Sequence, residues 1–155
     1  MSIEDWSTGS ESAFALSNYW LETCLSEHKD CHSFQASSDR KLPSRVINVG
    51  STDEHPFLHQ TEPSQTGVYL TLSHRWSNHV MTTTIATLDD RQASIPLDSM
   101  PPNFCDAVLV TRKLKIRYLW IDSLCIIQDS PDDWDAESAK MCHIYRGSLF
   151  TIFAA

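Results

Sequence analysis

The stretch that decides the fold is Arg117-Tyr-Leu-Trp-Ile-Asp-Ser-Leu-Cys-Ile-Ile-Gln-Asp129. Its apolar run, residues 118 to 127, is rich in Tyr, Trp, Ile and Leu and is too short to span a membrane. Such a run is typical of a central strand in a parallel sheet. Asp122, Ser123 and Cys125 interrupt it. Because buried polar groups need partners, these three residues predict either a site or a buried hydrogen-bond network.

The segment that follows predicts a helix from Pro131 to Arg146. Ser130 is a natural N-cap, Pro131 suits the first helical position, and Gly147 is a suitable stop. The acids of the first turns, Asp132, Asp133 and Asp135, are interpreted as a solvated helix start that the helix dipole favours. One face of this helix carries an apolar stripe at 3.6-residue spacing. The stripe consists of Trp134, Met141, Ile144 and Tyr145.

Glu137 lies inside that stripe, three residues after Trp134 and four before Met141. It is too far along the helix to be a first-turn acid that answers the dipole. A carboxylate on an apolar face is either paired or functional. Two interpretations therefore stand side by side: a catalytic carboxylate, or a structural ion pair with Arg75 or Arg112.

The bulk composition is that of an acidic globular domain. The chain has 155 residues, 41% hydrophobic and 21% charged, with a net charge of -8. Lys and Arg form no dense run, which argues against nucleic-acid binding as the main activity. No apolar stretch reaches the length of a membrane span, and the acidic N-terminus is unlike a signal peptide. Five cysteines, an odd number, indicate reduced thiols and a cytoplasmic protein.

The order of the expected elements predicts an α/β fold. A helix over residues 10 to 30 comes first, and Pro43 is expected to keep residues 42 to 49 off a central strand. After that, strands and helices alternate, which implies a mostly parallel sheet with flanking helices, joined by irregular loops. The alternating elements are a strand at 68–74, a helix at 103–115, the strand at 118–127, the helix at 131–146 and a strand at 148–155.

In open α/β sheets the site lies beyond the carboxyl ends of the strands. Two polar clusters fall there, namely Ser73-His74-Arg75-Trp76 and Asp122-Ser123. Arg75 could hold a phosphate and Trp76 could stack on a base. His74 alternates with core leucines, so it could equally be a buried structural histidine. Asp122 could orient His74 or a ligand hydroxyl, or cap loop amides as part of a structural network.

Cysteine and histidine also gather near the N-terminus. Cys24, His28 and Cys31 follow i, i+4, i+7 spacing on one helical face, and His32 or His55 could complete a zinc site. The spacing is not that of a standard zinc finger, so we interpret the face as plainly buried and predict no metal.

Several of these segments together resemble the fungal heterokaryon incompatibility (HET) domain. The matching segments include Leu42-Pro-Ser-Arg-Val-Ile-Asn48, Tyr69-Leu-Thr-Leu-Ser-His-Arg-Trp76 and Leu119-Trp-Ile-Asp-Ser-Leu-Cys-Ile-Ile-Gln128. The resemblance covers most of residues 20–155. It places an N-terminal helical segment at 1–41 and the HET domain at 42–155. Because members of the family usually run on beyond the final Ala-Ala, we expect the domain to be incomplete at its C-terminus.

The resemblance implies a role in fungal nonself recognition, where such domains trigger programmed cell death. It also implies a distant likeness of the second half to TIR domains, some of which cleave NAD+ with a helix glutamate near a tryptophan. Glu137 beside Trp134 resembles that pair. The implied enzyme is an NAD+ glycohydrolase that needs no cofactor, with Glu137 catalytic. Its substrate-binding residues are Ser73, His74, Arg75, Trp76, Asp122, Ser123 and Trp134.

A second function fits the same resemblance. Many TIR domains are non-catalytic signalling modules that act through homotypic contacts. The implied partners are then further copies of this chain or other incompatibility proteins.

Overall fold

The computed structural model describes residues 7, 9–29, 31, 40–76 and 80–154. The chain divides into two compact units, Met1–Ser38 and Asp39–Ala155. Each unit is described by itself.

The first unit contains one long helix, α1, from Glu11 to Glu27. Ser10 caps its start, and the Ser10 hydroxyl accepts a hydrogen bond from the amide of Ala13 at 3.2 Å. The helix expected over residues 10 to 30 is thus present. The buried face expected for it is wrong, because no residue of α1 is buried.

The second unit is built on a five-stranded sheet with the order β2-β1-β4-β3-β5. β3 runs parallel to β4 and β5, whereas β1 runs antiparallel to both β2 and β4. The α/β class is confirmed, but the sheet is mixed rather than mostly parallel. A short connection joins β1 to β2, and such a connection allows only an antiparallel pair. The strands are β1 Arg45–Asn48, β2 Phe57–Gln60, β3 Tyr69–His74, β4 Tyr118–Ile121 and β5 Thr151–Ala154.

β1 is an interior strand, which corrects the expectation drawn from Pro43. All four residues of β1 are buried, and the strand lies between β2 and β4. Because β1 begins at Arg45, two residues after Pro43, the proline never has to donate a ladder hydrogen bond.

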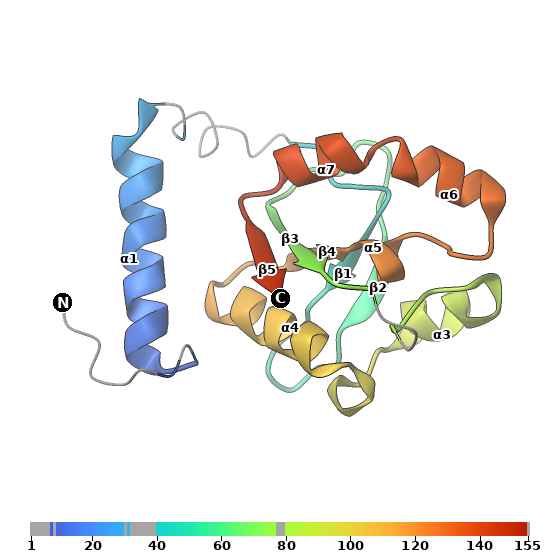
Figure 1. Cartoon of the computed structure of the whole chain (residues 1–155), viewed down its shortest axis with the longest axis horizontal. Coiled ribbons are helices and arrows are strands. Elements are labelled where there is room, and N and C mark those ends of the chain that lie inside the picture. Colours follow the sequence, from blue (N-terminus) through green and yellow to red (C-terminus); the bar gives the residue numbers. More distant parts are fainter. Residues whose placement is uncertain (1–6, 8, 30, 32–39, 77–79, 155) are drawn as a thin grey trace. The chain divides into compact units, whose positions relative to one another are not determined.

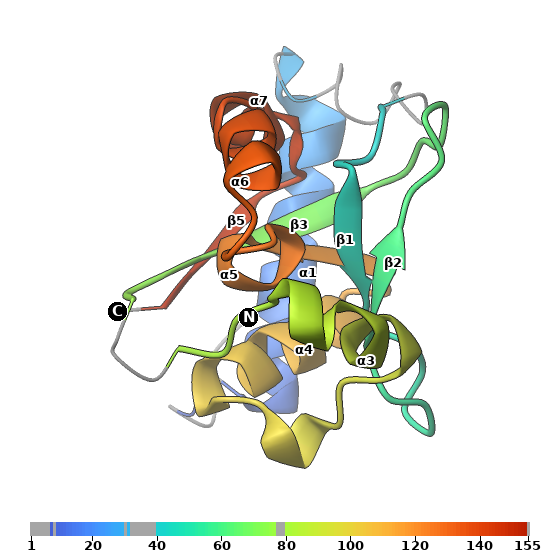
Figure 2. The same cartoon turned by 90° about the vertical axis from the view of Figure 1, so that its right-hand side faces the viewer.

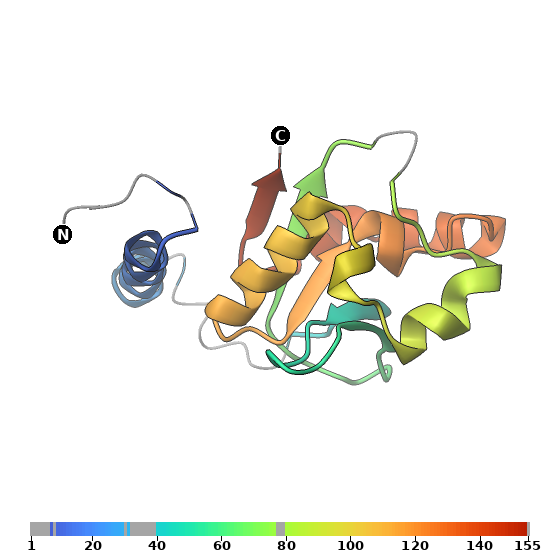
Figure 3. The ribbon, with the colours of Figure 1, turned by 90° about the horizontal axis from the view of Figure 1, so that it is seen from below.

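Helices cover both faces of the sheet. α4, Pro102–Lys113, lies on one face, and α6, Pro131–Ser138, lies with α7, Met141–Gly147, on the other (Figure 1, Figure 3). Because successive side chains of a strand point to opposite faces of the sheet, each strand packs against helices on both sides. On the α4 face, Phe104 packs edge-on against His74 with ring centroids 4.8 Å apart. On the other face, Tyr145 packs edge-on against Trp120 at 5.4 Å.

Short helices fill the long connection between β3 and α4. α3, Leu88–Ala93, lies beside β2 (Figure 2). It is preceded by the 3-10 turn η1, Ile85–Thr87, and followed by η2, Leu97–Ser99. The connection returns to the sheet through the amide of Ile95, which donates to the carbonyl of Pro56 at 2.7 Å.

Two elements of the second half differ from expectation. The strand expected over 118–127 ends at Ile121, and a short helix, α5, begins at Asp122 and ends at Cys125. The helix expected over 131–146 is interrupted between α6 and α7. There the amide of Lys140 donates to the carbonyl of Glu137 at 3.0 Å, a tight closure that ends α6 with no proline or glycine.

Candidate functional site

The predicted site residues lie at one end of the strands but in two separate groups, one around Asp122 and one on α6. β3 and β4 are parallel, so His74 and Asp122 follow the same end of neighbouring strands. β1 runs antiparallel to β4, so its first residue, Arg45, lies at this edge as well. Ser44 precedes Arg45 and contacts Glu137, which brings α6 to the same edge.

Asp122 is the centre of the first polar cluster. His74 Nε2 lies 3.0 Å from Asp122 Oδ1, and the indole of Trp76 donates to Asp122 Oδ2 at 2.9 Å. The rings of His74 and Trp76 are stacked, with centroids 6.2 Å apart. The amide of Ser123 donates to Asp122 Oδ1 at 2.7 Å. Asp122 therefore bonds His74, as considered for it, while the amide that it holds is that of Ser123 in the first turn of α5 rather than a loop amide.

The other members of this cluster differ in accessibility. Ser123 is fully buried, and its hydroxyl has no hydrogen-bond partner within the described chain. Arg75 is exposed, and none of the described residues pairs with it. Ser73 is half-buried opposite Phe153 of β5. The cluster thus offers a fixed Asp–His–Trp group beside a free guanidinium.

Glu137 forms a second site on α6. Only 5% of the residue is exposed, although it carries a carboxylate. Its Oε1 accepts hydrogen bonds from the Ser44 hydroxyl and the Lys140 ammonium, both at 2.8 Å. The ion-pair partner is therefore Lys140, and the pairing expected with Arg75 or Arg112 is wrong. Both hydrogen bonds to the carboxylate end on Oε1, so Oε2 has no hydrogen-bond partner among the described residues.

Trp134 lies one turn before Glu137 but is not part of the core. It is 49% exposed, whereas Ile144 of the same predicted stripe is 5% exposed. The interruption between α6 and α7 explains the difference, because a stripe extrapolated along one straight helix loses its register at Lys140. Trp134 therefore presents an aromatic surface to solvent beside a shielded carboxylate.

A third polar group at this edge was missed from the sequence. Arg45 is 7% exposed, and its Nη2 donates to both carboxylate oxygens of Asp133, at 2.7 and 2.5 Å. Its Nε donates to the carbonyl of Cys125 at 2.7 Å, and Asp133 also accepts from the amide of Ile127 at 2.8 Å. The expectation that Asp133 is a solvated helix-start acid is therefore wrong. No local sequence pattern indicated this pair, because Arg45 and Asp133 lie 88 positions apart.

The thiol of Cys125 is buried near these groups. The residue is 1% exposed, and burial raises the pKa of the thiol to about 12, with the nearby Asp122 and Glu137 carboxylates adding to the shift. A thiol that stays protonated at neutral pH is a poor nucleophile.

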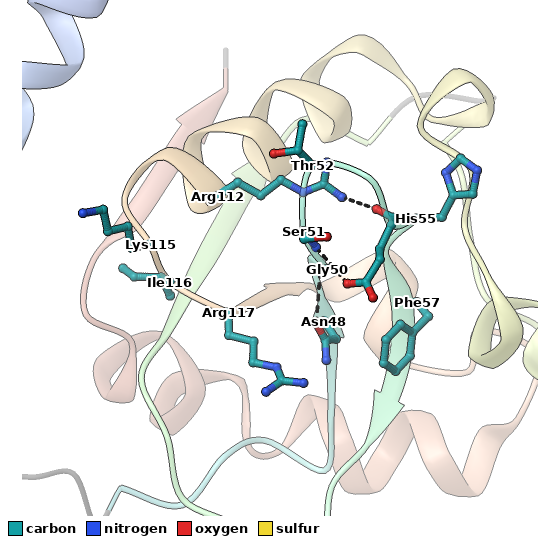
Figure 4. Close-up of a pocket in the computed structure, with 11 residues that line it drawn as sticks. Asn48, Gly50, Ser51, Thr52, His55, Phe57, Arg112, Lys115, Ile116 and Arg117 are labelled. Atoms are coloured by element: carbon teal, nitrogen blue, oxygen red, sulfur yellow. Dashed lines mark hydrogen bonds between the residues drawn. The ribbon is translucent and has the colours of Figure 1, made fainter.

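An open hollow of about 640 Å³ lies at the opposite end of the sheet (Figure 4). Its walls include Asn48 at the end of β1, Phe57 at the start of β2 and Arg117 just before β4. Because β1 is antiparallel to β4, this end is the one away from His74 and Asp122. The hollow is therefore separate from the predicted site.

Arg112, on one wall of the hollow, is committed to holding a loop. Its Nε donates to the carbonyl of Val49 at 2.7 Å. Its Nη2 donates to the carbonyl of Glu54, also at 2.7 Å (Figure 4). These bonds fix the turn between β1 and β2, so Arg112 is unavailable to Glu137.

The structure is an α/β domain with a mixed sheet and clusters of polar side chains at one end of its strands. A family model described as Heterokaryon incompatibility protein (HET) matches residues 69–155. The match covers more than half of the chain, and the chain therefore belongs to the heterokaryon incompatibility (HET) family. Comparisons with curated proteins and with solved structures gave no significant match. Among the described helices, none is both long and apolar enough to cross a membrane.

Proposed function

We propose that this chain is a cytoplasmic effector of fungal nonself recognition that kills the cell by hydrolysing NAD+ at Glu137. Membership of the HET family supports the incompatibility role. The observation that carries the catalytic part is the Glu137 carboxylate, 5% exposed, with a half-exposed Trp134 one turn before it on α6. The TIR-like pairing of glutamate and tryptophan supports the choice of NAD+ as substrate.

Hydrolysis of NAD+ breaks the bond between the ribose and the nicotinamide nitrogen. The bond electrons leave with nicotinamide, water supplies the new oxygen on the ribose carbon, and one proton is released. The transition state carries positive charge on the ribose, which a fixed carboxylate stabilises. Ser44 and Lys140 hold Oε1 of Glu137, and the free Oε2 would face the ribose. A preorganised carboxylate acts without having to reorient when the charge develops.

The strand-end cluster would bind the rest of the dinucleotide. Arg75 is exposed and free to pair with the pyrophosphate. Trp76 is 47% exposed and held by Asp122, so its ring can stack on a base. In this arrangement His74 and Asp122 position Trp76. Ser73 and Ser123 are their neighbours in the chain, next to His74 and Asp122 respectively.

Release of nicotinamide from NAD+ tests this proposal. We expect purified protein to release nicotinamide and Glu137→Gln to lower the rate by about 100-fold or more, as for other lost transition-state charges. The matched control is Asp135→Asn, which removes an exposed carboxylate from the same helix and should leave the rate unchanged. A Glu137→Gln variant as active as the wild type would overturn the catalytic role.

A second candidate is a non-catalytic module that signals by self-association. Large exposed apolar side chains favour it, because Trp76, Trp134 and Phe153 are 47%, 49% and 76% exposed. In this case Glu137→Gln would remain toxic when expressed in a fungal host. Phe153→Ser would abolish toxicity together with concentration-dependent assembly, measured by analytical ultracentrifugation.

A further inference from the structure

A cluster of metal-ligating side chains closes the end of α1, far in sequence from the HET match. Cys24, His28 and Cys31 each offer one ligand atom, and these atoms lie within 4.8 Å of one another. The two sulfurs are 3.3 Å apart. Two thiolates bound tetrahedrally to zinc at about 2.3 Å would lie roughly 3.8 Å apart, so small side-chain rotations suffice.

The backbone creates this convergence. α1 ends at Glu27, and the amide of His28 still donates to the carbonyl of Cys24 at 3.2 Å. The chain then turns, and the amide of Cys31 donates to the carbonyl of His28 at 2.9 Å. This turn returns the second thiol to the first. The two thiols therefore do not meet on the face of one continuous helix, because α1 ends at Glu27, before Cys31.

The position suits a cation for a second reason. The C-terminal end of a helix carries a partial negative charge, which basic side chains commonly answer. The last turn of α1 contains no basic residue. Because the last turn holds no lysine or arginine, none of its side chains repels a divalent ion held by Cys24 and His28.

The first unit also needs a source of stability. Domains shorter than about 40 residues usually depend on metals, disulfides or oligomerisation. The unit Met1–Ser38 is of that size, and α1, its long helix, has no buried residue. Most of the stability of a helix in a protein comes from the packing of one apolar face rather than from helix propensity. Metal binding to two thiolates would convert binding free energy into folding free energy.

We infer that Cys24, His28 and Cys31 bind one zinc ion, which fixes the end of α1. Both thiols lose their protons on binding, and the imidazole binds in its neutral form. These three residues fill three of the four tetrahedral positions, and solvent or another side chain takes the fourth. His32, considered for that position from the sequence, lies outside the described residues. His28 is exposed, so the ion can enter from solvent.

Metal analysis of the 155-residue chain tests this inference. We expect about one zinc per chain after dialysis, and thiolate-to-metal charge-transfer absorption when cobalt(II) replaces zinc. Cys24→Ser and Cys31→Ser should each reduce bound zinc to trace amounts. The matched control is Cys142→Ser, which removes an exposed thiol outside the cluster and should retain full zinc. Circular dichroism should show helix loss on chelation in the control but no further loss in Cys24→Ser.

Two outcomes would overturn the inference. One is a wild-type protein without zinc, including one whose Cys24 and Cys31 are joined in a disulfide, detected by mass spectrometry as the loss of two hydrogens. The other is equal zinc content in Cys24→Ser and Cys142→Ser. Neither outcome bears on NAD+ cleavage, because the cluster belongs to the first unit.

Discussion

Asp133 and Glu137 are carboxylates one turn apart on α6, yet their surroundings differ. Both oxygens of Asp133 are bonded by the Arg45 guanidinium, and its Oδ2 also accepts a backbone amide. Glu137 is more buried but is held through one oxygen, by a serine and by the ammonium of Lys140, whose side chain is 52% exposed. The saturated carboxylate is a structural anchor, and the one with a free oxygen is the candidate for chemistry.

A second anchor lies beyond Glu137 on α7. The hydroxyl of Tyr69 in β3 donates to the carbonyl of Ile144 at 2.7 Å. Glu137 is therefore held between two fixed points, one at Asp133 and one at Ile144. Preorganisation of this kind is what a catalytic carboxylate requires.

The largest effect should come from breaking the first anchor. Asp133→Asn leaves the buried Arg45 guanidinium without its counter-charge, so we expect the free energy of unfolding to fall by about 3–5 kcal/mol. Urea unfolding measures the loss, with Asp135→Asn as an exposed control that should change little. A loss below 1 kcal/mol would mean that Asp133 and Glu137 are not as different as their contacts indicate.

The second anchor, the hydrogen bond from Tyr69 to Ile144, can be disturbed by adding a side chain at Gly147. A Cβ atom at Gly147 would lie 2.7 Å from the Tyr69 hydroxyl oxygen, closer than side chains tolerate. We expect Gly147→Ala to lower stability by about 1–3 kcal/mol, as overpacking does. The same change in a Tyr69→Phe background should cost less, because the clashing oxygen is gone. Equal costs in the two backgrounds would contradict the contact.

Alkaline pH should lower the free energy of unfolding through the buried Cys125 and Tyr69 near the two anchors. Burial raises the pKa of Cys125 from 9.0 to about 12 and that of Tyr69 from 10.0 to about 12. The unfolded chain therefore loses these protons first, and stability is unaffected below pH 9 but falls as pH rises from 9 towards 12. Each such group contributes a slope of about 1.4 kcal/mol per pH unit.

Thermal melts from pH 8 to 11 check this expectation. Tyr69→Phe should flatten the decline above pH 10, the ordinary pKa of the tyrosine. A slope identical to that of the wild type would assign the decline to other groups.

The smallest effect on stability should come from Glu137 itself. Glu137→Gln keeps an acceptor for the Ser44 hydroxyl and releases Lys140 to solvent, so the free energy of unfolding should change by less than about 1 kcal/mol. Urea unfolding beside Asp133→Asn gives the direct contrast. A loss as large as that of Asp133→Asn would make Glu137 a second structural anchor.

The sequence predicted the parts of this domain that depend on local pattern. The strands β3 and β4 were indicated by their apolar runs, and α4 by its helical pattern. His74 was expected near Asp122 because both follow the carboxyl ends of strands. The break between α6 and α7 could not be predicted, because no proline or glycine lies there. The break is stabilised by the hydrogen bond from the Lys140 amide to the Glu137 carbonyl. The Arg45–Asp133 pair joins residues 88 positions apart, and neither side chain differs in sequence from a solvated one.

We propose above that this HET protein kills the cell by consuming NAD+ at Glu137. The most direct test is the NAD+ content of a fungal host after induced expression of the wild type and of Glu137→Gln. We expect NAD+ to fall before viability in cells expressing the wild type, and both to be preserved with Glu137→Gln. Loss of viability with unchanged NAD+, or equal killing by the variant, would contradict it.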